Sequence, residues 1–170
     1  MKKTILQQLI PFGILLFLGI SVYGQITSHS DASKQLDFLI GDWELFSSDN
    51  EMIGVNTIQL VFGTYTLEAN FENVNGLRTQ STFSYDNNQQ LWIKTWSDDF
   101  GNQLTFKGVF RSNKLVMNAT STNQGIKTFH RIIYKKQNDG TVAKIWQKSI
   151  NNKEWKTTYS GVYKRKKAVL

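Results

Sequence analysis

Hydrophobic and polar side chains alternate along most of the chain from residue 41 onwards. In the segment 77–85, for example, Leu77, Phe83 and Tyr85 fall on one face, and Arg78 and Gln80 fall on the other. The segments 104–111, 115–120 and 155–164 follow the same period, whereas 91–97 and 128–135 carry apolar residues on both faces. Because successive side chains of a β-strand point to opposite sides, the alternation predicts half-buried strands with one face toward an interior.

Clusters of Asn, Asp, Gly and Ser interrupt the alternation at nearly regular intervals. These residues favour turns because they tolerate positive φ or cap the backbone with their own side chains. Nine clusters divide the chain into ten segments; they lie at 49–51, 62–64, 73–76, 86–88, 98–102, 112–114, 122–125, 138–140 and 151–153. Such spacing is typical of barrels and sandwiches that are built from consecutive hairpins.

Composition supports an all-β fold. The single proline, Pro11, lies near the N-terminus, so the rest of the chain is free of a residue that interrupts β-ladders. Only residues 32–40 are predicted to be helical: Asp31 is placed to cap this segment, and Leu36, Leu39 and Ile40 share one side of it. A helix of this length must pack against the sheet to be stable.

Gly41-Asp42-Trp43 follows the predicted helix and begins the first strand. A short helix, a Gly-x-Trp motif and an antiparallel meander together resemble the calycin superfamily, and the N-terminal part is similar to lipocalins. The resemblance implies that Trp43 closes one barrel end beneath a cation from the last strand. Arg165, in phase with Tyr159 and Tyr163, is the candidate cation, and we expect both Trp43 and Arg165 to be substantially buried.

The number of segments refines the resemblance. Lipocalins have eight strands, whereas ten segments are more like fatty-acid-binding proteins and nitrobindin-like barrels. We therefore predict an all-β fold, a ten-stranded antiparallel up-and-down β-barrel with a short N-terminal helix, over residues 31–170.

The N-terminal residues predict export. Lys2 and Lys3 precede an apolar run at 10–20, and Val22-Tyr23-Gly24 resembles a cleavage site. We expect residues 1–24 to be a signal peptide cleaved before Gln25, residues 25–30 to be a flexible lead-in, and the mature protein to be periplasmic or secreted. An uncleaved N-terminal anchor is the alternative.

Net charge is +7, and four basic residues at 164–167 contribute much of the excess. The remaining lysines are scattered instead of forming a stripe among stacking aromatics, so nucleic acid is not an expected partner. We interpret the charge as a solvated surface with, at most, weak attraction to anionic envelope surfaces.

No constellation of catalytic or metal-ligating residues stands out. The chain has no cysteine and two histidines, of which His29 falls in the predicted lead-in. His130 alone is too little for a zinc site and lacks a nucleophile-elbow motif. Asp98 and Asp99 are interpreted as turn-shaping residues. We predict no catalytic residues, no metal and no cofactor, with haem held by His130 as the alternative that nitrobindin-like barrels suggest.

Aromatic residues on the inward faces are the strongest functional signal. A ten-stranded barrel encloses more space than a small one, because diameter grows with strand number. We therefore expect a cavity for a small hydrophobic or amphipathic molecule. The predicted ligand-binding residues are Trp43, Phe83, Tyr85, Phe106, Met117, His130, Tyr159 and Tyr163, with Thr157 among the polar groups. The alternatives are a calycin-type isomerase or cyclase, and a structural or interaction barrel of the cell envelope.

Overall fold

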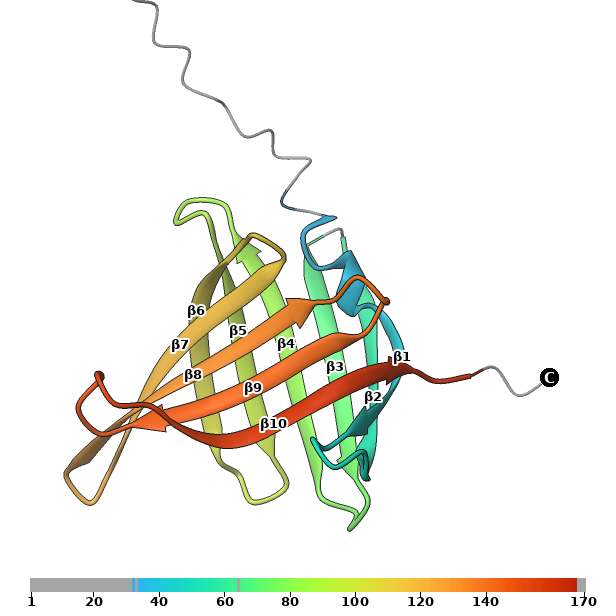
Figure 1. The fold of residues 1–170 in the computed structure, drawn as a ribbon. Helices are drawn as coiled ribbons and strands as arrows, with labels where there is room; N and C mark the ends of the chain where they lie inside the picture. The colour runs from blue at the N-terminus through green and yellow to red at the C-terminus, as the bar shows by residue number, and fades with distance from the viewer. Residues whose placement is uncertain (1–31, 33, 64, 168–170) are drawn as a thin grey trace, which may run out of the picture.

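A computed structural model describes residue 32, residues 34–63 and residues 65–167. These residues form a closed antiparallel barrel in which each strand pairs with its neighbours in sequence and β1 pairs with β10 (Figure 1). The strands are β1 (Gly41–Phe46), β2 (Met52–Phe62), β3 (Thr66–Asn73), β4 (Arg78–Asp86), β5 (Leu91–Asp98), β6 (Gln103–Arg111), β7 (Lys114–Asn123), β8 (Ile126–Lys136), β9 (Val142–Ser149) and β10 (Lys156–Arg165). The prediction of a ten-stranded up-and-down barrel is confirmed.

The N-terminal segment is helical within the predicted range 32–40, since Ala32 and Lys34 are α-helical and a 3₁₀-helix follows them. Asp31 lies outside the described residues, as do the predicted signal peptide and lead-in. Between Ala32 and β1 the structure has a 3₁₀-helix, η1 (Asp37–Leu39), with no side-chain cap at its start. Side chains three residues apart are aligned along a 3₁₀-helix, and Leu36 and Leu39 are both fully buried. Burial of these two leucines thus stabilises the segment in place of a cap.

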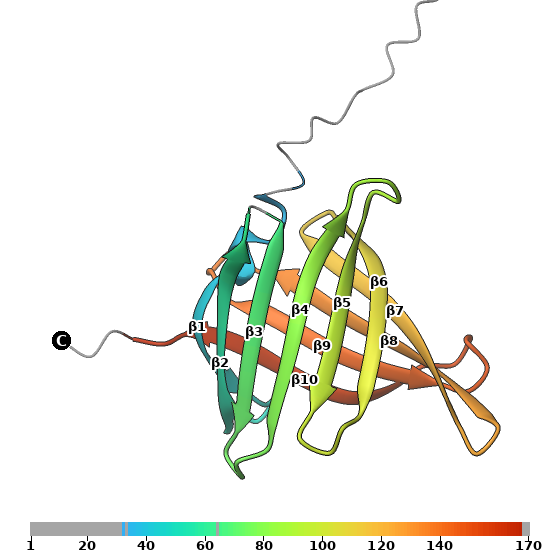
Figure 2. The ribbon, with the colours of Figure 1, turned by 180° about the vertical axis from the view of Figure 1, so that it is seen from behind.

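The two ends of the barrel differ. In an up-and-down barrel successive connections alternate between the ends, and η1 lies at the end where β1 begins (Figures 1 and 2). We call this the plugged end. The connections that follow β1, β3, β5, β7 and β9 surround the opposite end, which we call the open end. No helix among the described residues has the length and apolar character needed to cross a membrane.

The interior is packed unevenly along its length. Toward the plugged end and the middle, Tyr85 and Phe110 are half-buried but most inward side chains are fully buried: Trp43, Leu45, Ile58, Phe83, Trp92, Phe106, Leu115, Met117, Ile132 and Tyr163. Toward the open end, inward side chains keep partial exposure: Phe71, Trp96, Leu104, Trp146 and Tyr159. An inward aromatic that is only half-buried faces unfilled space, so the open half of the barrel is hollow.

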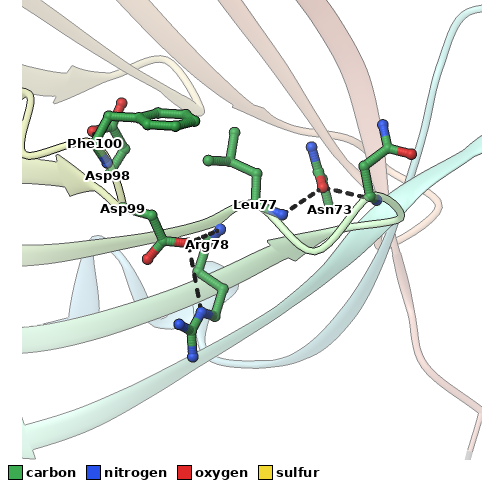
Figure 3. A network of polar contacts seen from close by, with 7 residues as sticks. Asn73, Leu77, Arg78, Asp98, Asp99 and Phe100 are labelled. Carbon is green, nitrogen blue, oxygen red and sulfur yellow. Dashed lines mark hydrogen bonds and ion pairs between the residues drawn. The ribbon is translucent and has the colours of Figure 1, made fainter.

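Side chains fix the loops at the open end (Figure 3). Asn73 Oδ1 accepts hydrogen bonds from the backbone of Asn75 and Leu77, each at 2.9 Å. Asp99 Oδ2 accepts the Arg78 N–H at 2.9 Å and lies 3.5 Å from the Arg78 guanidinium. Asp98 Oδ1 accepts the N–H of Phe100 and of Asn102. Asp98 and Asp99 therefore shape turns, as their sequence context predicts.

Gly108 of β6 sits where no side chain fits. A Cβ there would lie 1.9 Å from the carbonyl oxygen of Val116 and 2.6 Å from the Cα of Met117, both on β7. Both obstacles belong to the backbone, so neither can move aside by a rotamer change. The close approach of β6 and β7 therefore depends on glycine.

Gly108→Ala should destabilise the barrel by about 1–3 kcal/mol, the usual cost of inserting a methyl group into a packed site. Urea denaturation monitored by circular dichroism measures this change. Val109→Ala on the same strand is the control, because Val109 is 38% exposed and should cost roughly 0.5 kcal/mol. Equal effects of the two substitutions would show that β7 does not depend on a bare backbone at Gly108.

Candidate functional site

The plugged end is closed by Trp43 and Arg165, which are directly paired across β1 and β10. The Arg165 guanidinium carbon lies 3.9 Å from the Trp43 ring centroid. Trp43 is 1% exposed, and its Nε1 donates to the carbonyl oxygen of Leu39 at 2.7 Å. Arg165 in turn donates to the carbonyl oxygen of Ile40. The stack therefore joins the first and last strands to the turn that plugs the barrel, as the lipocalin resemblance implies.

Arg165 is exposed, and the expectation that it is substantially buried is wrong. One face of the guanidinium covers the indole, and the end of β10 leaves the rest of it in water. Gly41 makes this placement possible, because a Cβ at that position would overlap the Arg165 guanidinium. The φ of Gly41 is +133°, a conformation that other residues rarely adopt. The glycine of Gly-x-Trp thus provides both the bend and the space for the cation.

The predicted ligand-binding residues all come from inward positions but fall into two groups. Trp43, Phe83, Phe106, Met117 and Tyr163 are at most 1% exposed and belong to the packed core. Tyr85 packs near the plugged end, with ring-centroid distances of 5.3 Å to Trp92 and 6.1 Å to Tyr65. Only His130 and Tyr159 border the hollow half of the barrel. Ligand binding by any member of the set stays a prediction.

A pocket of about 620 Å³ opens at the open end. Its inner walls include Trp96, His130 and Trp146, and its rim includes Asp98 and Lys148. Trp146 packs edge-on against Trp96 at 5.2 Å and lies 6.2 Å from the His130 ring. Large apolar faces with a few polar groups between them are the usual lining of small-molecule sites.

Several buried polar atoms beside this pocket have no hydrogen-bond partner among the described residues. They are Trp146 Nε1, Tyr159 OH and His130 Nδ1, and farther in the barrel Asn56 Oδ1. A buried polar group without a partner costs about 1–3 kcal/mol, so each is normally satisfied by protein, water or ligand. Trp146 Nε1 and Tyr159 OH are hydrogen-bond donors that have no acceptor among the described residues.

The barrel wall has a side opening near the same place. β6 and β7 pair only from Lys107↔Asn118 to Arg111↔Lys114, so the part of β6 nearest the open end is not paired with β7. An outer hollow of about 570 Å³ there reaches the inward-facing Ala119 and His130. His130 also lines the end pocket, so the two hollows share this residue.

Two lysines point into the barrel, which the sequence interpretation missed. Lys94 lies between Trp92 and Trp96 on β5 and is 2% exposed. Its Nζ donates to Ser81 Oγ. Lys144 lies between Val142 and Trp146 on β9 and is half-buried. The interpretation of every lysine as solvated is wrong for these two. The sequence feature that marks both is a lysine with apolar residues two positions before and two positions after it, on the same face of a strand.

Lys144 is enclosed by aromatic rings. Its Nζ lies 5.4–5.9 Å from the ring centroids of Phe71, Tyr134, Tyr159 and Tyr163. Burial lowers the pKa of Lys144 to about 8. Burial, followed by the charge of Lys144, lowers the pKa of Lys94 well below its ordinary value. The rings therefore stabilise a cation that desolvation disfavours.

No carboxylate among the described residues pairs with these amines. Among the inward positions of the ten strands, Asp98 at the rim is the one acidic residue. Its carboxylate is occupied by the backbone and side chain of its own loop. Glu68 and Glu72 point outward on β3, as the alternation predicts.

The final strand contains an irregularity that the alternation hides. The register of β10 against β9 shifts between Thr157 and Tyr159. Thr157 pairs with the outward Gln147, and Trp155 packs under the outer Arg131, whose guanidinium lies 3.8 Å from the indole centroid. The prediction that Thr157 points inward is therefore wrong, because a β-bulge exchanges the two faces of a strand.

His130 does not offer a nitrogen to a haem iron in this arrangement. Its Nε2 is 2.8 Å from Ser121 Oγ, and its Nδ1 is buried against other side chains. Burial, and then the charge of Lys148, lowers the pKa of the imidazole, which keeps it neutral at neutral pH. No cluster of three or more metal-ligating side chains occurs in the described part of the chain. We derive no haem or metal chemistry from this site.

Comparison with known proteins adds no family to this picture. No protein-family model matches the chain, and no curated protein matches its sequence. The closed ten-stranded barrel is consistent with a calycin-like fold.

Proposed function

We propose that this protein is an exported calycin-like barrel that binds a small amphipathic molecule in its open half. The observation that carries the proposal is the contrast between the two halves of the interior. Core side chains such as Phe106 are fully buried, whereas Trp96, Trp146 and Tyr159 point inward and remain partly exposed. A barrel that served only as a scaffold would gain stability by filling this space.

The chemistry of the lining supports an amphipathic ligand. Trp96 and Trp146 offer apolar faces, while Trp146 Nε1 and Tyr159 OH offer polar atoms without partners. The end pocket of about 620 Å³ lies within the usual range for small-molecule sites.

Ligand binding should change the fluorescence of Trp96 and Trp146. Of the five tryptophans, Trp43 and Trp92 are buried in the core and Trp155 lies on the outer face. Native mass spectrometry of freshly purified protein should show a bound small molecule, and its removal and return should shift the emission. The variant Trp96→Phe/Trp146→Phe should lose most of this response, whereas Trp155→Phe should keep it.

Absence of bound mass together with no emission change upon adding amphiphiles would overturn the proposal. A Soret band in the purified protein, lost in His130→Ala, would instead establish haem binding.

Export rests on the N-terminal sequence. The mature protein recovered from the envelope or medium should begin at Gln25. An intact Met1 on protein from the cytosol would contradict cleavage and export.

A further inference from the structure

We propose that the hollow half of the barrel is built for a ligand with an anionic head group, a carboxylate or an equivalent oxyanion, which Lys144 binds. This inference rests on the proposed function and adds the chemical class of the ligand. It starts from the two amines that the barrel encloses, Lys94 and Lys144, which have no carboxylate beside them in the described interior.

The two amines are not equivalent. Lys94 is fully buried and its Nζ already donates to Ser81 Oγ. Lys144 makes no hydrogen bond to any described residue; its Nζ lies among four aromatic rings, the nearest being Tyr159 at 5.4 Å from the centroid. Lys144 is also partly accessible. It is therefore the amine that an entering ligand meets, and an ammonium has three protons to donate.

Neighbouring donors point to the same ligand chemistry. Tyr159 lies directly opposite Trp146 across β9 and β10, and Lys144 precedes Trp146 by two positions on the same face of β9. Trp146 Nε1 is a donor only, and both it and Tyr159 OH lack partners. Ammonium, indole N–H and phenol therefore belong to neighbouring inward positions of β9 and β10, and each of these groups can donate a hydrogen bond to an oxyanion.

The same arrangement disfavours a cationic ligand. An ammonium that entered this space would face Lys144 at close range with no carboxylate nearby, and like charges in a low-dielectric interior repel strongly. A neutral alcohol would satisfy one donor and leave the amine unpaired. A carboxylate both neutralises the amine and accepts several hydrogen bonds, and charge-assisted hydrogen bonds are about twice as strong as neutral ones.

The tail of such a ligand has a defined place. Trp146, two positions beyond Lys144 on the same face of β9, lines the end pocket together with Trp96 and His130, and the part of β6 nearest the open end is not paired with β7. The aromatic faces of Trp96 and Trp146 suit an aliphatic or aromatic chain. We infer that the head group lies deep in the barrel and that the tail extends toward the mouth.

The test compares three amphiphiles that share one tail: dodecanoate, dodecanol and dodecylamine. Binding of each to the delipidated protein is measured at neutral pH by tryptophan fluorescence and by calorimetry. The wild-type protein should bind dodecanoate roughly ten- to a hundred-fold more tightly than dodecanol, because a hydrogen bond to a charged group outweighs a neutral one. Dodecylamine should bind most weakly.

Two lysine variants locate the head group. Lys144→Met should reduce dodecanoate affinity to that of dodecanol and leave dodecanol binding unchanged. Lys148→Met, which removes a charge from the mouth of the same pocket, should change dodecanoate affinity by less than roughly three-fold, since an exposed charge attracts weakly. Lys144→Gln serves as a second variant, and circular dichroism confirms that each variant is folded.

The outcomes separate the two proposals. If dodecanoate and dodecanol bind equally to the wild-type protein, or if Lys148→Met causes the loss expected of Lys144→Met, the anionic head-group site is overturned while the binding function stands. If none of the three amphiphiles binds, the proposed function falls and this inference falls with it.

Discussion

Trp43→Ala should lower the free energy of unfolding by about 3–5 kcal/mol, the usual cost of deleting a large buried aromatic. Trp43 is 1% exposed, donates to Leu39 and packs against Tyr163 at a ring-centroid distance of 5.9 Å. Its removal opens a cavity at the plugged end, leaves the Leu39 carbonyl without its donor, and takes away the surface on which Arg165 rests. Urea denaturation at constant pH measures the change.

A double-mutant cycle tests the contact with Arg165. Arg165→Ala should cost less than Trp43→Ala because the guanidinium is exposed on one side. The two substitutions should couple by about 0.5–3 kcal/mol, since the side chains touch. Arg165→Lys should not restore the full stability, because an ammonium does not stack as a planar guanidinium does. Lys166→Ala is the control for the basic tail; additive effects of Trp43 and Arg165 would show that the stack contributes nothing.

The stability of the barrel should rise as the pH increases from 8 to about 10. Lys144 has a folded-state pKa of about 8 against an ordinary value of 10.5. Between these values the unfolded chain binds more protons than the folded one, so deprotonation favours folding. Lys94 acts in the same direction. Below pH 8 the folded protein bears the full cost of the enclosed Lys144 ammonium, which is about 2–3 kcal/mol after allowance for its partial exposure.

The tyrosines that face Lys144 reverse the trend at higher pH. Burial raises the pKa of Tyr134, Tyr159 and Tyr163. These groups stay protonated in the folded protein while they ionise in the unfolded chain, so stability is lost as the pH rises above about 10. The free energy of unfolding should therefore pass through a maximum near pH 10.

Lys144→Met isolates the lysine contribution. The variant should be more stable than the wild-type protein by about 2–3 kcal/mol at pH 7, because a buried charge is replaced by an apolar chain of similar length. The difference should shrink at pH 10, where Lys144 is mostly neutral in the folded protein while the unfolded chain is still mostly protonated. Lys156→Met, at an exposed position, should show neither effect. A stability gain that is the same at both pH values would mean that desolvation of the Lys144 charge is not its cause.

A stabilising substitution at Lys144 would have a functional meaning. Proteins commonly keep destabilising groups where a ligand needs them. If Lys144→Met is more stable and binds dodecanoate less tightly, the enclosed amine contributes to ligand affinity and lowers the free energy of unfolding.

The sequence by itself determined the strands and their faces wherever a segment alternates. Turn residues separate the ten strands, and period-two patterning places Phe83, Phe106 and Met117 inside, because neighbouring side chains on a strand must point to opposite sides. It also supplied the closing pair, since Gly41 and Trp43 begin the first strand and Arg165 ends the last.

Tertiary structure alone decided what the barrel encloses. In the segments around Lys94 and Lys144 both faces carry apolar bulk, so patterning does not say which face is inside; pairing with β4 and β8 does. The bulge that turns Thr157 outward and the early end of the β6–β7 ladder depend on neighbouring strands. Closure of a barrel fixes every register at once through contacts between residues far apart in sequence. For that reason the sequence alone does not predict the filled half, the hollow half or the two enclosed amines; they are defined when the ten strands pair.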